Sequence, residues 1–224
     1  MVAVMLALGW WQLQRAAVKQ QIADDVVLKN QMEFDLAHFV IDVEQRYARA
    51  TAVGRYLPQQ TFFLDSQTHH GQVGYHVITP FQVESNGQLI LVNRGWVGAG
   101  STRLVLPQID TPVEQLSISG RLNLPASKPL FWDDSVPVVQ NGAWQFLSLP
   151  YYQLQTGLSV APLLLELDKT LDQVGGYVRQ WRTYDDQWIN RHRAYALQWF
   201  SMALVFLLMC LFVLYKSNGV KGDV

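Results

Sequence analysis

The chain has 224 residues and a formal net charge of −1, and half of its residues are apolar, which excludes a disordered chain. Residues 20–190 carry 11 Lys and Arg against 17 Asp and Glu, so this part has a net charge of −6 and lacks the basic surface that nucleic acids require. The other six basic residues lie beside the apolar ends of the chain, where they can contact lipid headgroups.

The first 19 residues predict a transmembrane helix. Met1–Trp11 is apolar but too short to cross a bilayer by itself, so we expect a span over residues 1–19 whose first part is absent from this chain. The alternative is a signal peptide that is cleaved after Gly9, although no basic residue precedes the apolar run. Val18–Asn30 predicts a helical continuation into a polar stalk.

Residues 20–190 predict one extramembrane domain that consists mostly of strands. The Asn-Gly pair at 86–87 tolerates positive φ and predicts an antiparallel hairpin from Tyr75 to Trp96. Leu149–Gly157 predicts a short helix with a glycine at its end. Runs of β-branched and aromatic residues between turn signals predict strands over Tyr47–Gly54, Thr61–Leu64, Gly74–Val83, Gln88–Val97, Gln115–Leu124 and Val160–Leu167.

A second transmembrane helix is predicted over residues 191–216, followed by a short polar tail over 217–224. Ala194–Tyr215 contains no charged side chain and extends about 33 Å as a helix, which is enough to cross the hydrocarbon core. Aromatic residues lie near both ends of this run, as is typical of membrane interfaces. The predicted fold class is therefore α+β, with a predominantly antiparallel β domain flanked by two terminal transmembrane helices.

The sequence offers no recognisable catalytic motif. It contains no nucleophile elbow, Walker loop, zinc-protease motif or dinucleotide fingerprint, so we do not expect an enzyme. Cys210 is the single cysteine and cannot form a disulfide framework or a zinc site alone. His69 and His70 are adjacent and point to opposite sides of an extended segment, so we expect no metal site there.

Polar residues within the two terminal helices are candidates for contacts between helices. Gln12 and Arg15 lie on one face of the first helix, because residues three or four apart share a face. Gln198 interrupts the second apolar run, and such a residue is costly in lipid unless it is paired. Solvation at the membrane interface is the alternative for these residues.

His192 is the candidate cofactor ligand. A neutral imidazole is a good axial ligand for haem iron. Tyr195 and Trp199 lie along the same helix face and would flank the macrocycle, while Arg191 or Arg193 would pair with its propionates. From spacing alone, an interfacial histidine without a cofactor remains the alternative.

Three motifs resemble the signatures of the Surfeit locus protein 1 family of cytochrome oxidase biogenesis factors. They occur in the expected order and extend from one end of the chain to the other. They are Leu8–Arg15 (LGWWQLQR), Gly74–Pro80 (GYHVITP) followed by Leu91–Trp96 (LVNRGW), and Asn190–Phe200 (NRHRAYALQWF).

The resemblance implies a membrane-anchored protein that matures cytochrome c oxidase. It implies two transmembrane helices and a large domain on the periplasmic or intermembrane-space side, and we expect a multi-pass protein of a bacterial inner membrane. The implied partners are the largest oxidase subunit, haem a synthase and the lipid bilayer. For a bacterial member, the resemblance implies that haem a is held through a histidine near the start of the second span, which is the position of His192.

Two functions remain open from the sequence. The first is a haem-handling chaperone, and the second is a haem-free membrane scaffold that binds oxidase subunits; a membrane-bound enzyme is a third alternative for which no catalytic group is visible. Tyr75, Arg94, Gly95 and Trp96 of the central motif are candidates either for partner binding or for shaping the domain.

Overall fold

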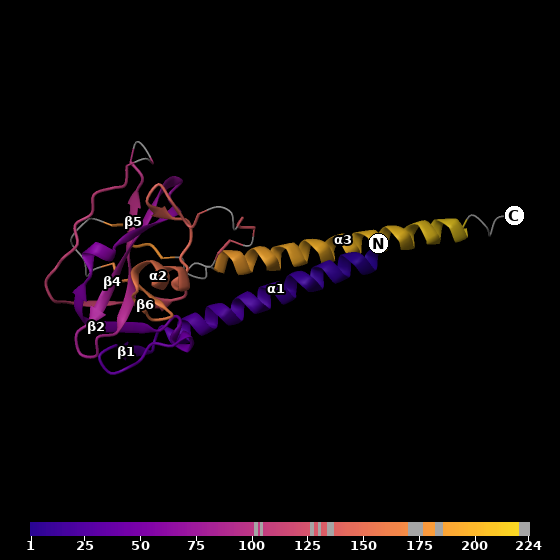
Figure 1. The fold of residues 1–224 in the computed structure, drawn as a ribbon. Coiled ribbons are helices and arrows are strands. Elements are labelled where there is room, and N and C mark those ends of the chain that lie inside the picture. The colour runs from indigo at the N-terminus through magenta and orange to yellow at the C-terminus, as the bar shows by residue number, and fades with distance from the viewer. Residues whose placement is uncertain are drawn as a thin grey trace. The chain divides into compact units, whose positions relative to one another are not determined.

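The computed structural model describes residues 1–100, 103, 105–125, 128–129, 131–133, 137–169, 177–181 and 186–219. The chain divides into two compact units, one made of Met1–Val27 with the C-terminal helix and the other of Leu28–Trp181 (Figure 1). The α+β class is confirmed, because one unit consists of long helices and the other contains a large sheet.

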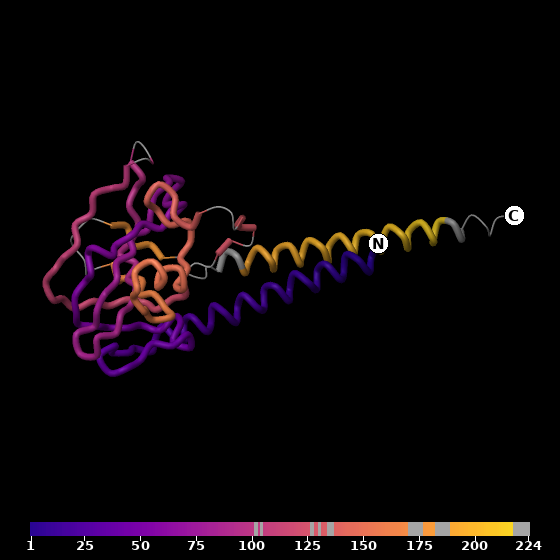
Figure 2. Tube along the Cα trace, viewed as in Figure 1, coloured from indigo at the N-terminus to yellow at the C-terminus, as the bar shows by residue number. Residues whose placement is uncertain are grey.

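The first unit is an antiparallel pair of helices, α1 (Val2–Lys29) and α3 (Asp186–Gly219), which lie side by side (Figure 2). The predicted continuation of the first helix through the polar stalk is thus confirmed. Half-buried residues follow the three-and-four spacing of a heptad, which defines a seam between the helices. The buried residues of this seam recur every seven positions and are mostly small, which allows close approach: Gly9 and Ala16 on α1, and Ile189, Ala196 and Ala203 on α3.

One described segment, Ile189–Lys216 of α3, is long and apolar enough to cross a membrane, as judged by its length and composition. Only 6% of its most apolar window is buried, whereas the core helix of a water-soluble protein is mostly buried. Leu204–Tyr215 is exposed at most positions, as a lipid-facing segment would be. The helix α1 does not meet the same criteria, so a second membrane crossing by residues 1–19 stays a prediction.

The second unit contains nine described strands in one sheet, with the order β1-β2-β6-β9-β5-β4-β3-β8-β7. Most neighbouring strands are antiparallel, as predicted, whereas β1 on β2, β8 on β3 and β9 on β5 are parallel. The strands are β1 (Glu33–Asp35), β2 (Arg49–Tyr56), β3 (Phe62–His69), β4 (Gln72–Val83), β5 (Leu89–Gly98), β6 (Leu116–Asn123), β7 (Val139–Gln140), β8 (Ala143–Trp144) and β9 (Leu164–Leu167). Short 3₁₀ helices cover Val43–Gln45 and Pro58–Gln60.

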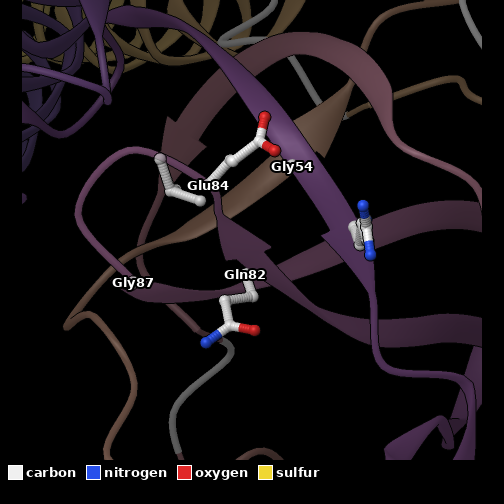
Figure 3. Close-up of a pocket in the computed structure, with 6 residues that line it drawn as sticks. Gly54, Gln82, Glu84 and Gly87 are labelled. Atoms are coloured by element: carbon white, nitrogen blue, oxygen red, sulfur yellow. The ribbon is translucent and has the colours of Figure 1, made fainter.

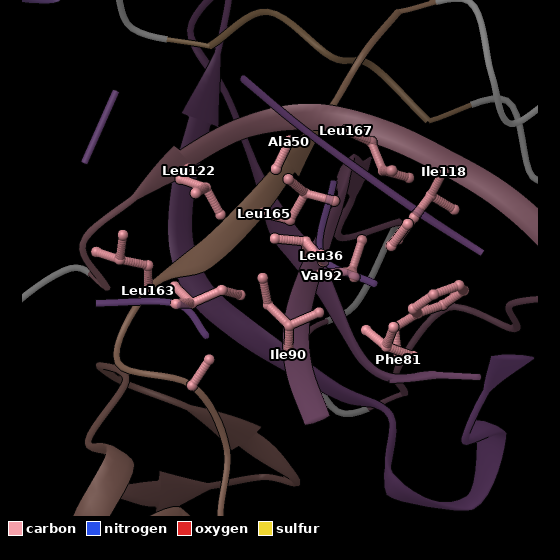
Figure 4. Packing of buried hydrophobic residues seen from close by; sticks show 14 of the residues in the cluster. Leu36, Ala50, Phe81, Ile90, Val92, Ile118, Leu122, Leu163, Leu165 and Leu167 are labelled. Atoms are coloured by element: carbon pink, nitrogen blue, oxygen red, sulfur yellow. The ribbon is translucent and has the colours of Figure 1, made fainter. Parts of the chain in front are cut away.

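Five of these strands close into a ring, because β4 pairs with β5 and also returns to β2. Gly54 permits this closure: a Cβ on Gly54 would lie 2.0 Å from the carbonyl oxygen of Gln82 on β4. Side chains of the ring strands alternate between the two faces of the sheet, and those on the inner face fill the ring. Figure 4 shows the resulting core, which includes Leu36, Ala50, Phe81, Ile90, Val92, Ile118, Leu122, Leu163, Leu165 and Leu167.

The predicted hairpin and short helix are both confirmed. In the hairpin, Tyr75 pairs with Val97 and Gln82 pairs with Leu89, and Gly87 in the turn has a φ of 69°. The helix α2 (Leu149–Thr156) begins after Ser148, whose hydroxyl accepts from a backbone amide, and ends at Gly157 with a φ of 72°. It covers a second apolar cluster outside the ring, which includes Phe62, Leu64, Ile78, Leu91, Trp144 and Tyr152.

Candidate functional site

His192 is joined to the opposite helix by a hydrogen bond in the middle of the seam. Its Nδ1 lies 2.7 Å from Oε1 of Gln12, although 180 residues separate the two in the chain. Both residues occupy seam positions and are half-buried. Gly9 and Ala16, which lie three residues before and four residues after Gln12, keep the helix axes close enough for the amide to reach the ring. The structure thus brings together a residue predicted as a cofactor ligand and one predicted as a helix contact.

Cationic side chains of α1 lie near His192, and its two neighbours in the chain on α3 are also cationic. Lys19 and Arg15 of α1 are near enough to act electrostatically on its ring. On α3, Arg191 and Arg193 are exposed on either side of it, and Arg193 Nη2 lies 3.5 Å from Oε1 of Gln20. The helix pair therefore places two cations of α1 near the imidazole, and two exposed cations flank it in the sequence of α3.

Lys19 was not among the residues predicted to contact a cofactor. A signal for it was present in the sequence, because Lys19 follows Gln12 by seven residues and so takes the equivalent heptad position. Arg15 was predicted only as a helix contact; its guanidinium lies 5.5 Å from the ring centroid of Trp11 on its own helix. The sequence pattern predicts the compensating cations on α3 alone, at Arg191 and Arg193.

The aromatic residues after His192 differ in exposure. Trp199 occupies a seam position and is half-buried, whereas Tyr195 is 52% exposed. Gln198 is exposed on α3 and does not take part in the seam with α1. A contact between Gln198 and a helix of another protein stays a prediction.

Arg94 of the central motif lies in the interior of the β unit. It is fully buried and donates hydrogen bonds to Oγ1 of Thr111 at 2.6 Å and to the carbonyl oxygen of Asp110 at 2.8 Å. Its guanidinium carbon is 5.1 Å from the ring centroids of both Tyr56 and Tyr177. These contacts give Arg94 a role within the fold, where it ties β5 to two loops.

Gly95 and Trp96 bind the chain segment before α3. The backbone N–H and C=O of Trp96 pair with Val178 at 2.8 and 2.9 Å. Gly95 has a φ of 133°, and a Cβ on it would lie 2.7 Å from Cβ of Tyr177. Tyr75, the fourth residue predicted from this motif, is also buried and packs edge-on against Phe63. Most residues of this motif therefore already make packing or hydrogen-bond contacts within the domain.

His76 is a half-buried histidine beside the same motif. Its Nδ1 lies 3.1 Å from Nδ2 of Asn93, whose Oδ1 accepts from the backbone N–H of Gly95 at 3.2 Å. Burial lowers the pKa of His76 to about 4, so the ring is neutral at physiological pH. Its ring also meets Trp181 edge-on at 5.7 Å. The arrangement makes His76 part of the packing of β4 on β5.

A shallow groove follows the β2–β4 closure. It has a volume of about 310 Å³ and is lined by Gly54, Arg55, Gln82, Val83, Glu84 and Gly87 (Figure 3). Glu84 accepts a hydrogen bond from Gln115, so its carboxylate is engaged. Among the described residues, no group of three or more His, Cys, Asp or Glu side chains is placed to hold a metal ion. The lining of the groove therefore offers one carboxylate and one guanidinium, but no histidine comparable to His192.

The comparisons with known proteins cover nearly the whole chain. A family model described as the SURF1 family matches residues 1–204. The chain is similar to a SURF1-like protein of Monosiga brevicollis, with 24% identity over 98% of this chain and 87% of that protein. It is also similar to SURF1-like proteins of Rickettsia felis, with 24% identity over 97% and 94% of the two chains, and of Caenorhabditis elegans, with 25% identity over 73% and 54%.

Proposed function

The chain belongs to the SURF1 family, and from this premise we propose that it is an assembly factor for haem–copper cytochrome c oxidase that holds haem a as cargo. The observation that carries the proposal is the hydrogen bond between His192 and Gln12 within a cluster of cations. An imidazole fixed through one nitrogen, next to aromatic and basic side chains, has the donor chemistry that a haem site requires.

The residue types at this site are those that a haem-binding site requires. His192 would hold the iron through Nε2, because its Nδ1 is engaged with Gln12. Trp199, which is half-buried in the seam, and the exposed Tyr195 would supply aromatic surface on the same helix. Cations from both helices, which are Arg15, Lys19, Arg191 and Arg193, would pair with the two propionates. The cargo would bring the iron, and the chain would hold and orient it.

The membrane setting is part of the same proposal. Ile189–Lys216 would cross the bilayer, and α1 would cross beside it as the second span of a multi-pass protein. We place the protein in a bacterial inner membrane with the β unit on the periplasmic side. Its client would be the largest oxidase subunit, and haem a synthase would be the donor of the cargo.

The proposed factor works by binding and not by catalysis. An assembly factor needs only to bind a partly assembled client more tightly than the finished one, since this difference drives release. The helix pair offers the required surface: beyond Phe206, most side chains of α3 are exposed and apolar, among them Leu207, Leu208 and Leu211. Such a surface suits contact with the membrane helices of a client.

The test is the absorption spectrum of the full-length protein purified in detergent from cells that make haem a. We expect a Soret band that His192→Ala removes. The matched control is His38→Ala, because the His38 side chain is 76% exposed and lies in the other unit. A His192→Ala protein that keeps the wild-type amount of haem would show that His192 is not the ligand.

The exposed apolar face of α3 favours one other function, a haem-free scaffold that binds oxidase subunits. The scaffold would retain its client without His192. Capture of the largest oxidase subunit by His192→Ala, together with full oxidase assembly in cells that carry this variant, would support the scaffold and count against the haem site.

A further inference from the structure

We propose that Gln12 is a positioning residue, which fixes the tautomer and the orientation of His192 so that Nε2 presents its lone pair to the ligand of the site. The identity of that ligand as haem rests on the proposed function. The geometric part of the inference rests on the contact between Oε1 of Gln12 and Nδ1 of His192, at 2.7 Å.

The tautomer follows from the chemistry of this contact. An amide oxygen only accepts hydrogen bonds, so the Nδ1 that contacts Oε1 of Gln12 must carry the proton. A neutral imidazole has a single N–H, which leaves Nε2 unprotonated. Histidines that bind metals nearly always donate their other ring N–H to an oxygen, and this partner orients the ring and raises its basicity. Gln12 has the position and the atom type for that role.

The location of Gln12 explains why the acceptor for the Nδ1–H of His192 is a side chain from the opposite helix. Within α3, the backbone carbonyl groups around His192 already accept hydrogen bonds from the N–H groups of the helix. The small seam residues Gly9 and Ala16 bring α1 close to α3 at this level, and Gln12 lies between them. The acceptor therefore comes from a helix that is 180 residues away in sequence, which makes the ligand geometry depend on the pairing of α1 with α3.

The experiment compares three substitutions in the full-length chain in detergent. Gln12→Leu keeps the approximate size of the side chain and removes the acceptor, whereas Gln12→Glu keeps an acceptor oxygen at the same reach. Gln14→Leu is the matched control, because Gln14 is an exposed glutamine two residues further along the same helix.

The first readout needs no haem. The ¹⁵N shifts of selectively labelled histidine rings report which nitrogen carries the proton, and His192→Ala identifies the His192 signals among those of the five histidines. We expect the Nδ1–H form in the wild type, in Gln12→Glu and in Gln14→Leu. In Gln12→Leu we expect a shift towards the Nε2–H form.

The second readout is a titration with haem a followed at the Soret band. Loss of an outer partner of a metal-binding histidine lowers affinity by about 10–100-fold, so we expect this loss for Gln12→Leu and near-wild-type binding for Gln12→Glu and Gln14→Leu. An unchanged ¹⁵N pattern in Gln12→Leu, or an equal effect of Gln14→Leu, would overturn the inference whether or not haem binds. A wild-type protein that takes up no haem would overturn the proposed function and the haem part of the inference, while the ¹⁵N data would still decide the role of Gln12.

Discussion

Gly9 of α1 lies directly against the ring of Phe200 of α3, and a Cβ on Gly9 would be 2.7 Å from the ring atom Cε1. At this point the two helices are in contact without a side chain from α1. The contact lies one turn from Gln12, so it sets the separation at which the amide can reach His192. Close packing at Gly9 and the polar contact at Gln12 are therefore two parts of one interface.

Enlarging Gly9 is expected to separate the helix pair. Gly9→Leu overpacks the seam against Phe200 and should lower the free energy of unfolding in mixed detergent micelles by about 1–3 kcal/mol. The measurement is loss of helicity by circular dichroism as the fraction of denaturing detergent rises. Ala7→Leu is the control, because Ala7 is exposed on the same helix. Recovery of stability in Gly9→Leu combined with Phe200→Ala would identify the clash, and absence of recovery would contradict this explanation.

Removing the buried guanidinium of Arg94 is expected to destabilise the β unit. Arg94→Ala leaves the Asp110 carbonyl and the Thr111 hydroxyl without this donor and opens a cavity between Tyr56 and Tyr177. The expected loss is roughly 2–4 kcal/mol in urea unfolding. Arg55→Ala, at an exposed position on β2, should change stability by less than about 0.5 kcal/mol. Equal effects of the two substitutions would contradict the role assigned to Arg94.

The two glycines of β5 are expected to respond differently to alanine. Gly95 has a φ of 133° and no room for a Cβ, so Gly95→Ala should cost more than about 1 kcal/mol. At Gly98 the nearest atom to a built Cβ is 3.6 Å away, and Gly98→Ala should leave stability unchanged or slightly higher. Melting temperatures of the two variants provide the comparison. A well-tolerated alanine at Gly95 would show that the segment around Tyr177 does not pack there as described.

Local patterns account for the parts of the fold that the sequence predicted. The hairpin of β4 and β5 could be found because the Asn-Gly turn and the alternating arms are contiguous in sequence. Gly157 similarly marked the end of α2, since a glycine after a short helix adopts positive φ at no steric cost. These features depend on a few adjacent residues, which is why single-sequence reasoning could reach them.

Long-range pairings escaped prediction for a physical reason. Closure of β2 on β4 and the parallel pairing of β9 with β5 join strands whose hydrophobic patterns carry no information about their partners. The strands β1, β7 and β8 have only two or three residues, which is too short for a recognisable alternation. Arg94 was open to a surface role because arginine is seldom fully buried, and its acceptors lie in a loop without regular structure.

The candidate site also depends on a long-range pairing that local sequence patterns do not reveal. Gln12 and His192 were each singled out as polar groups in apolar helices, but their pairing needed the register of α1 on α3. The sequence carries a signal for the facing surfaces, because small residues recur seven positions apart on each helix, at Gly9 and Ala16 on α1 and at Ala196 and Ala203 on α3. Seven-residue spacing of small residues is therefore the sequence signal that indicates which faces meet.

Protonation of His76 makes the stability of the β unit depend on pH, and substitution of this residue isolates its contribution. Its pKa falls from about 6.5 in the unfolded chain to about 4 in the fold, because burial disfavours the charged ring. Between these values the unfolded state binds the proton that the folded state excludes, so stability from this group is complete above pH 6.5 and is lost as the pH falls towards 4.

The expected loss for wild type is up to about 3 kcal/mol over this interval, measured as urea unfolding free energy against pH. His76→Gln retains an amide that can bind Asn93 and does not titrate, so its curve should be flatter than that of the wild type by this amount. His38→Gln, at an exposed position, should keep the wild-type dependence. Parallel curves for wild type and His76→Gln between pH 4 and 6.5 would mean that another group protonates on unfolding, and that the ring of His76 is not shielded by β5 and Trp181 as the structure describes.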